Sequence, residues 1–169
     1  MEEAGQTKLF QKAIVIFYSR SGNTRFVAEE LANRLSADLA PLRDKKNRKG
    51  IWGYFWGGFD SLMKHMTKLE DYNIELNNYD LVFIGCPNWA ANIPPAIRTF
   101  LAQKYWANKK IVFFCTQESM GAERVFNNLR GLVKGAEIVN EKYFNKVNEN
   151  KDAVREQIKS WLAGLDLGL

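Results

Sequence analysis

The stretch AIVIFYSRSGNT, residues 13–24, joins an apolar run to a short polar loop and the beginning of a helical pattern. Ile14 to Phe17 read as a buried strand, and residues 24–35 place apolar side chains on one face of a helix. Such a junction aims backbone N–H groups and hydroxyls at one spot, where the helix dipole favours an anion. An ordinary strand-to-helix turn with a good N-cap has the same pattern, so this stretch alone leaves both interpretations open.

The alternation of strand and helix continues along the chain. The run DLVFIGC, residues 80–86, has no polar alternation, so both faces of this strand should be covered. Strands are predicted for residues 13–18, 38–42, 80–86, 111–115 and 136–143, and helices for 24–35, 59–68, a segment starting at Pro94-Pro95, a segment burying Val125, Leu129 and Leu132, and 150–164.

This order predicts a three-layer, doubly wound α/β domain around a parallel five-stranded sheet. Parallel strands need crossover helices, and the crossovers are right-handed, so helices cover both faces of the sheet. Ligands on such sheets bind at the carboxyl ends of the strands, where the strand order reverses.

The chain has 169 residues, which suits one domain with one core. We expect residues 12–169 to form that domain and residues 1–11 to be an N-terminal extension. No run approaches the roughly 18 apolar residues needed to cross a bilayer. The first residues also lack the pattern of a signal peptide. A cytoplasmic protein without a membrane span is predicted.

Cysteine and histidine usage argues against a metal site or a catalytic triad. Cys86 and Cys115 end apolar runs, make no CxxC motif and have no histidine nearby, so we interpret them as reduced core residues. The only histidine, His65, falls in a predicted helix and is interpreted as a surface residue. The carboxylates form no obvious catalytic pair, and no catalytic residue is assigned.

The net charge of +5 is concentrated in residues 43–49, which hold five positive charges and one negative charge. Nucleic acid, an acidic protein partner, a ligand phosphate or solvation alone would each explain such a run. A solvated surface loop is the favoured interpretation. Nucleic-acid binding is not expected, since one short basic run is poor evidence for it.

Two motifs resemble the flavodoxin family. The loop SRSGNT, residues 19–24, resembles the family's phosphate loop, T/S-x-T/S-G-x-T. The segment YDLVFIGCPNWAANIPPAIRTFL, residues 79–101, resembles the third strand, the flavin loop and the following helix. Both motifs are in the family's order, and the last strand carries no long insertion, as in short-chain members. The resemblance implies a sheet of strand order 2-1-3-4-5 that binds one FMN.

The resemblance also implies a set of cofactor-binding residues. Ser19, Ser21, Asn23 and Thr24 would hold the FMN phosphate, Gly22 would allow the tight turn, and Arg20 would add charge or face water. The second loop beside the flavin ring would be Pro87, Asn88, Trp89, Ala90, Ala91 and Asn92, with backbone groups of Ala90, Ala91 and Asn92 aimed at the ring edge.

Trp89 has two interpretations at this stage: stacking on one face of the flavin, or filling the core under the loop. Thr116, Gln117 and Gly121 complete the predicted site in a third loop, residues 116–121. Many family members have an aromatic side chain there that stacks on the flavin, and this sequence has none. Trp52, Tyr54, Phe55, Trp56 and Phe59 either compensate by covering the flavin or substrate, in the same subunit or across a dimer, or anchor a long loop.

Two related functions follow from the resemblance. The leading one is an FMN-dependent electron carrier between proteins, and the alternative is an FMN-dependent oxidoreductase that passes hydride from NAD(P)H to a quinone or similar acceptor. The basic run would suit an acidic, ferredoxin-like partner or the 2′-phosphate of NADPH. The protein is expected to be a monomer or a homodimer. Reduced FMN is anionic, so a chain of net charge +5 predicts a less negative potential for the second electron than in an acidic flavodoxin, provided that positive residues lie within ~10 Å.

Two functions from another class are excluded by single positions. A phosphoryl-receiving domain needs an Asp at the end of the third strand, where this chain has Gly85, Cys86 and Pro87. A low-molecular-weight tyrosine phosphatase needs Cys-x5-Arg, and the positions that would hold the arginine are Asn92 and Gly121.

Overall fold

The computed structural model of the chain describes residues 12–45 and 66–165. In this part, five strands form one sheet in the order β2-β1-β3-β4-β5, and each neighbouring pair is parallel. The predicted architecture and strand order are therefore confirmed. The strands are β1 (Ala13–Phe17), β2 (Asp38–Pro41), β3 (Leu81–Pro87), β4 (Lys110–Gln117) and β5 (Glu137–Asn145).

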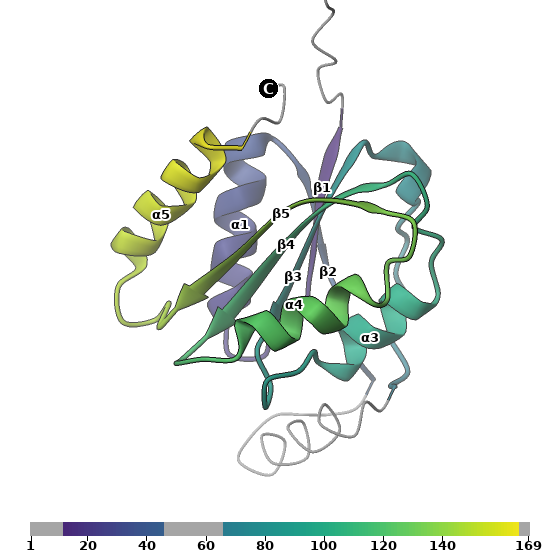
Figure 1. Cartoon of the computed structure of the whole chain (residues 1–169), viewed down its shortest axis with the longest axis horizontal. Coiled ribbons are helices and arrows are strands. Elements are labelled where there is room, and N and C mark those ends of the chain that lie inside the picture. Colours follow the sequence, from purple (N-terminus) through teal and green to yellow (C-terminus); the bar gives the residue numbers. More distant parts are fainter. Residues whose placement is uncertain (1–11, 46–65, 166–169) are drawn as a thin grey trace, which may run out of the picture.

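Helices cover both faces of the sheet, as Figure 1 shows. The helices α1 (Asn23–Leu35) and α5 (Lys151–Ala163) lie on one face, and α3 (Pro95–Ala102) and α4 (Ala122–Arg130) lie on the other. A short 3-10 helix, η1 (Leu76–Asn78), precedes β3 and was not predicted.

The core is divided into two layers by the alternation of side chains along the strands. Ile14 and Ile16 of β1 point into the layer under α3 and α4, whereas Val15 and Phe17 point into the layer under α1 and α5. The central strands β3 and β4 are buried along most of their length. This explains why their sequences are continuous apolar runs rather than alternating ones.

Only glycine fits at position 85 of β3, because a neighbouring aromatic ring occupies the space of a side chain. Gly85 pairs in register with Phe114 of β4, whose side chain is fully buried. A Cβ atom at Gly85 would overlap the Phe114 ring, because the ring lies directly against the glycine backbone. The contact fills the core one residue before Cys86 and two before the strand ends at Pro87.

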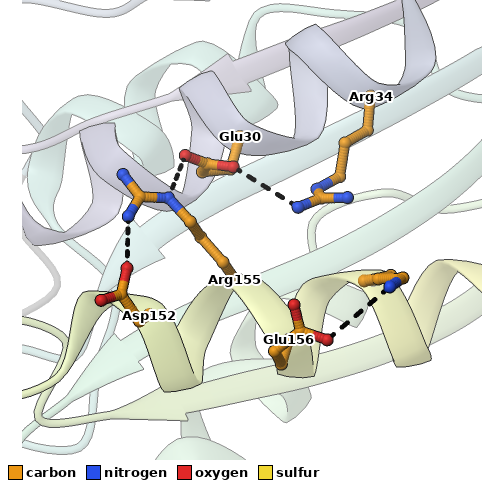
Figure 2. A network of polar contacts seen from close by, with 6 residues as sticks. Glu30, Arg34, Asp152, Arg155 and Glu156 are labelled. Carbon is orange, nitrogen blue, oxygen red and sulfur yellow. Dashed lines mark hydrogen bonds and ion pairs between the residues drawn. The ribbon is translucent and has the colours of Figure 1, made fainter.

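An ion-pair network links α5 to α1 (Figure 2). Arg155 Nε lies 2.8 Å from Glu30 Oε1, and Arg155 Nη1 lies 2.7 Å from Asp152 Oδ1. Glu30 also faces Arg34, at 3.8 Å. The side chains of this network are between 20% and 91% exposed, so solvent weakens the ion pairs, and the buried Val154 and Ile158 supply most of the packing free energy of α5.

Several predicted elements differ from the structure or lie outside it. Of the predicted helix 59–68, residues 59–65 lie outside the described residues, and residues 66–68 are not helical, so the prediction is wrong for these three. There the backbone extends and pairs instead, since Leu69 forms an antiparallel bridge with Asp44. The predicted extension 1–11, the aromatic segment 52–59, His65 and most of the basic run 43–49 also lie outside the described residues.

The ends of two other elements are shifted. The helix α4 ends at Arg130, so Leu132 is half-buried in the turn that follows rather than inside the helix. The last strand extends two residues beyond its predicted end, to Asn145, because β4 continues to pair with it through Gln117.

Within residues 12–45 and 66–165, no helix is both long enough and apolar enough to cross a membrane.

Replacing Gly85 by alanine should lower the free energy of unfolding by about 2–3 kcal/mol, because the added methyl group overpacks the core against Phe114. Urea unfolding followed by circular dichroism measures this change. Gly131→Ala is the matched control, since Gly131 has φ −63° and its nearest non-neighbouring atom would lie 3.6 Å from an added Cβ. The double variant Gly85→Ala/Phe114→Leu should regain part of the lost free energy of unfolding. Equal losses in Gly85→Ala and Gly131→Ala would contradict the explanation.

Candidate functional site

Three loops meet at the carboxyl ends of the central strands. The first loop (residues 18–22) follows β1, the second loop (residues 88–94) follows β3, and the third loop (residues 118–121) follows β4. The sheet order places β2 on one side of β1 and β3 on the other, so the chain changes direction at this point. Crevices outside the carboxyl ends of strands at such a reversal are where ligands bind in open α/β sheets.

The first loop leaves backbone donors open at the start of α1. Gly22, with φ +98°, is the N-cap, and its N–H donates to Ser19 Oγ at 3.2 Å. The first helical bond runs from Phe26 N to Gly22 O, so the N–H groups of residues 23–25 precede the hydrogen-bond ladder of the helix. The helix has no side-chain cap and no acidic residue in its first turn. These amides therefore remain available to an external anion.

Thr116, near the end of β4, connects the first and second loops. Its hydroxyl lies 2.8 Å from that of Thr24 in α1, and both side chains are buried. Its carbonyl oxygen accepts a hydrogen bond from Asn88 N at 2.8 Å. The spatial relation between the start of α1 and the second loop is therefore fixed through one residue of the central sheet.

The second loop contains a tight turn that closes on itself. Trp89 and Asn92 exchange both backbone hydrogen bonds, each at 3.0 Å. Between them, Ala90 and Ala91 have φ of +53° and +55°, a left-handed conformation that costs an alanine of order 1–2 kcal/mol per residue. The backbone groups of Asn92 that were predicted to face a flavin are thus used inside the turn, and those of Ala90 and Ala91 remain as candidates.

The Asn92 side chain, which is almost fully buried, anchors this turn. Its Oδ1 accepts three hydrogen bonds, from Ile93 N at 2.9 Å, Arg98 Nη2 at 2.9 Å and Asn128 Nδ2 at 3.0 Å. Arg98 comes from α3 and Asn128 from α4. The turn is therefore held from both helices that cover this face of the sheet.

Trp89 lies in the core under the second loop. Only 8% of the residue is exposed, its ring meets the Tyr18 ring edge-to-face with centroids 5.5 Å apart, and Arg20 Cζ lies 5.5 Å from the ring centroid. This packing matches the core interpretation of Trp89. Stacking of Trp89 on a flavin stays a prediction, and Arg20 is placed against the ring rather than simply in water.

The third loop packs closely on the second. Asn88 Nδ2 donates to Met120 O at 2.8 Å and to Gln117 Oε1 at 3.1 Å, while Gln117 Nε2 donates to Asn145 Oδ1 at 2.9 Å. Gly121, with φ +107°, is the N-cap of α4, and a Cβ there would lie 2.9 Å from Asn88 Nδ2. Glycine is thus needed both for the backbone conformation and for the close approach of the two loops.

Buried polar atoms without partners gather around these loops. Among the described residues, four such side-chain atoms occur: Asn23 Oδ1, Asn88 Oδ1, Arg98 Nε and Glu141 Oε1. The first three belong to the loops or to residues directly contacting them. Because buried polar groups in folded proteins are nearly always hydrogen-bonded, this concentration indicates a site that a polar ligand completes.

All predicted site residues lie on the three loops or on the strand and helix ends beside them. Pro87 is half-buried at the end of β3, and Ser21 is exposed at the tip of the first loop. The residues that the sequence interpretation missed are Arg98, Glu118, Asn128 and Asn145. Glu118 Oε1 lies 3.4 Å from Asn23 Nδ2 at the start of α1. Arg98 had a usable signal, since it is the only charged residue in a helix made mainly of apolar residues.

A sequence model described as flavodoxin matches residues 61–164, more than half of the chain. The chain belongs to the flavodoxin family. A putative flavoprotein from Bacteroides uniformis superposes with a TM-score of 0.75 at 21% identity, over 90% of this chain and 97% of that chain. A flavoprotein from Lactobacillus acidophilus in complex with FMN superposes with a TM-score of 0.68 at 19% identity, over 82% and 96%.

Flavodoxin 2 from Bacillus cereus superposes with a TM-score of 0.56 at 16% identity, over 90% of this chain and 95% of that chain. At these identities the likeness establishes the flavodoxin-like fold and nothing finer. A comparison with curated protein sequences gives no significant match.

Asn92→Ala should lower the free energy of unfolding by about 3 kcal/mol, because it removes the acceptor of a buried guanidinium and of two further donors. Asn128→Ala removes only one of these donors and should cost about 1 kcal/mol. Urea unfolding of the cofactor-free protein compares the two variants. Equal losses would show that Asn92 does not anchor the second loop through its side chain.

Proposed function

We propose that this chain binds FMN and carries electrons between redox partner proteins. The observation that supports this proposal most strongly is the set of open donors and unpartnered buried atoms where the three loops meet. The N–H groups of residues 23–25 suit a phosphate ester, and the buried oxygens of Asn23 and Asn88 suit donors of a polar ligand. When bound, FMN supplies the electron-transfer chemistry.

The residues divide between the two ends of the cofactor. The phosphate would bind to the hydroxyls of Ser19 and Ser21 and to the first amides of α1. The ring would lie beside the second and third loops, where the backbone of Ala90 and Ala91 and the side chain of Asn88 would offer it polar groups. The loops contain two charged side chains, Arg20 and Glu118, so recognition there depends mainly on hydrogen bonds and shape.

An exposed apolar side chain supports the proposal that the electron donor or acceptor is a protein. Met120, at the tip of the third loop, is 81% exposed, and Ala90, at the tip of the second loop, is also exposed. Such side chains favour transient contact with a protein surface, and the net charge of +5 would steer an acidic partner. An acidic, ferredoxin-like protein is the proposed class of partner.

The cytoplasm is the proposed compartment. Cys86 and Cys115 are free thiols, and both are buried. A hydrogen bond with Cys115 and burial raise the pKa of Cys86 well above its usual value, so this thiol stays neutral and unreactive. Two neighbouring cysteines that remain reduced fit a reducing environment.

The cofactor proposal is tested by titrating the cofactor-free protein with FMN and with riboflavin, which lacks the phosphate. FMN should bind more tightly by two orders of magnitude or more, roughly the free energy of two charge-assisted hydrogen bonds. Ser21→Glu places a carboxylate at the tip of the first loop and should remove most of this difference by repulsion. Ser160→Glu on α5 is the control of equal charge. Calorimetry measures both ligands.

Riboflavin binding as tightly as FMN would contradict the placement of the phosphate. No heat with either ligand, in protein shown to be folded by circular dichroism, would contradict the cofactor itself.

The carrier proposal predicts that NADPH alone does not reduce bound FMN. Mixing the FMN-loaded protein with excess NADPH under anaerobic conditions should leave the visible flavin absorption unchanged for minutes, whereas dithionite should bleach it. Within the described residues, the loops expose apolar and amide groups suited to a protein surface, and the charges available to a dinucleotide there are few. Rapid bleaching by NADPH would instead establish the alternative, an NAD(P)H-dependent oxidoreductase.

A further inference from the structure

Arg98 is a buried cation beside the candidate site. Only 8% of the residue is exposed, Nη2 donates to Asn92 Oδ1 at 2.9 Å, and Nε has no partner. Burial lowers the pKa of the Arg98 guanidinium, yet arginine stays protonated at any physiological pH. Among residues 12–45 and 66–165, no carboxylate forms an ion pair with it.

This arrangement is unfavourable for the protein alone. A buried charge costs free energy unless it is paired, and the acceptor that Arg98 has in the described structure is a neutral amide oxygen. Arg98 also lies near the start of α3, where its N–H donates to Pro94 O and where the helix dipole repels a cation. A neutral donor would make the same hydrogen bond, so the positive charge itself needs an explanation.

The guanidinium lies one hydrogen bond behind the second loop. Asn92, which accepts from Arg98, also closes the turn that contains Ala90 and Ala91. Under the proposed function, this turn lies beside the flavin ring. FMN that takes up two electrons from the redox partner and one proton from water gains one negative charge on the ring. Arg98 presents a positive charge without a carboxylate partner behind the turn that would lie beside this ring.

We propose that Arg98 is the built-in counter-charge of the reduced flavin and raises the reduction potential of the bound cofactor. This inference rests on the proposed binding of FMN. Arg98 does not touch the reacting atoms of the flavin. Its positive charge acts on the ring from behind Asn92, through electrostatic attraction. The attraction is not present with the neutral oxidised ring, so it favours the reduced form selectively. It is also poorly screened by salt, because the guanidinium is buried.

The test compares the reduction potential of the FMN-loaded wild type with that of Arg98→Gln, by dithionite titration against reference dyes. Arg98→Gln should weaken binding of reduced FMN relative to oxidised FMN by about tenfold. For a two-electron couple, this corresponds to a potential about 30 mV more negative. The affinity for oxidised FMN should change much less, which separates an effect on charge from a loss of the site.

Three further variants separate charge from shape. Arg98→Lys keeps the charge and should retain at least half of the potential difference. Asn92→Asp leaves Arg98 in place but neutralises it with an adjacent carboxylate, so the potential should fall about as much as in Arg98→Gln. Arg34→Gln, near the far end of α1, removes the same charge from the chain and should leave the potential unchanged.

The outcomes are distinct. If Arg98→Gln does not fold, Asn92→Asp and Arg98→Lys decide the question. A potential equal to that of the wild type in Arg98→Gln or Asn92→Asp overturns the inference, as does an equal fall in Arg98→Lys and Arg98→Gln. If the wild type binds no FMN, the proposed function fails before the role of Arg98 is reached, whereas FMN bound at an unchanged potential contradicts the role of Arg98 alone.

Discussion

The contact between Thr116 and its two neighbours holds the site together. Its hydroxyl meets Thr24 at 2.8 Å, and its carbonyl oxygen binds the amide of Asn88 at 2.8 Å. These contacts depend on the register of the central strands, which pairs Pro87 with Thr116. A slip of one residue would turn the Thr116 side chain to the opposite face of the sheet and separate the first and second loops. The packing of Phe114 on Gly85, just below, helps to exclude such a slip because the ring fits only against glycine.

The loops themselves are strained, and the surrounding helices hold them. Ala90 and Ala91 adopt left-handed conformations that alanine rarely occupies. The turn persists because the side chain of Asn92 is fixed by donors from the backbone of Ile93, from α3 and from α4. Asn88 then attaches the third loop to the second. Local strain at the tips is therefore offset by buried hydrogen bonds below them, which keeps the backbone of the turn oriented before any ligand arrives.

The fold could be predicted from the sequence because its signals are repeated and local. Apolar runs such as residues 80–86 and the helical spacing of residues 24–35 each specify one element, and parallel strands leave few topologies. The place of Ser19 to Thr24 between the first strand and the first helix followed in the same way, whereas their role in binding a phosphate rested on the family resemblance.

The polar contacts of the site could not be predicted in this way. Asn92, Arg98 and Asn128 meet through three different elements, and spacing along the chain does not show which side chains face each other across them. Trp89 illustrates the same limit: its aromatic character suited either a flavin or the core, and the sequence did not show that its ring packs against Tyr18. The helix prediction for residues 66–68 rested on the spacing of apolar residues. That spacing gives no sign of the bridge between Leu69 and Asp44, which joins distant segments of the chain.

The two ends of the proposed cofactor site attract negative charge by different means. At the proposed phosphate end, open amides and the dipole of α1 would act on a charge that FMN carries in every redox state. At the ring end, Arg98 acts on a charge that appears only on reduction. The phosphate end therefore governs how tightly both forms bind, and the ring end governs the ratio of their affinities, which by linkage is the shift in potential. Glu118, beside Asn23, would oppose the charge of such a phosphate and so would affect the first quantity far more than the second. Affinity and potential can thus be altered independently by residues that lie on different loops of one site.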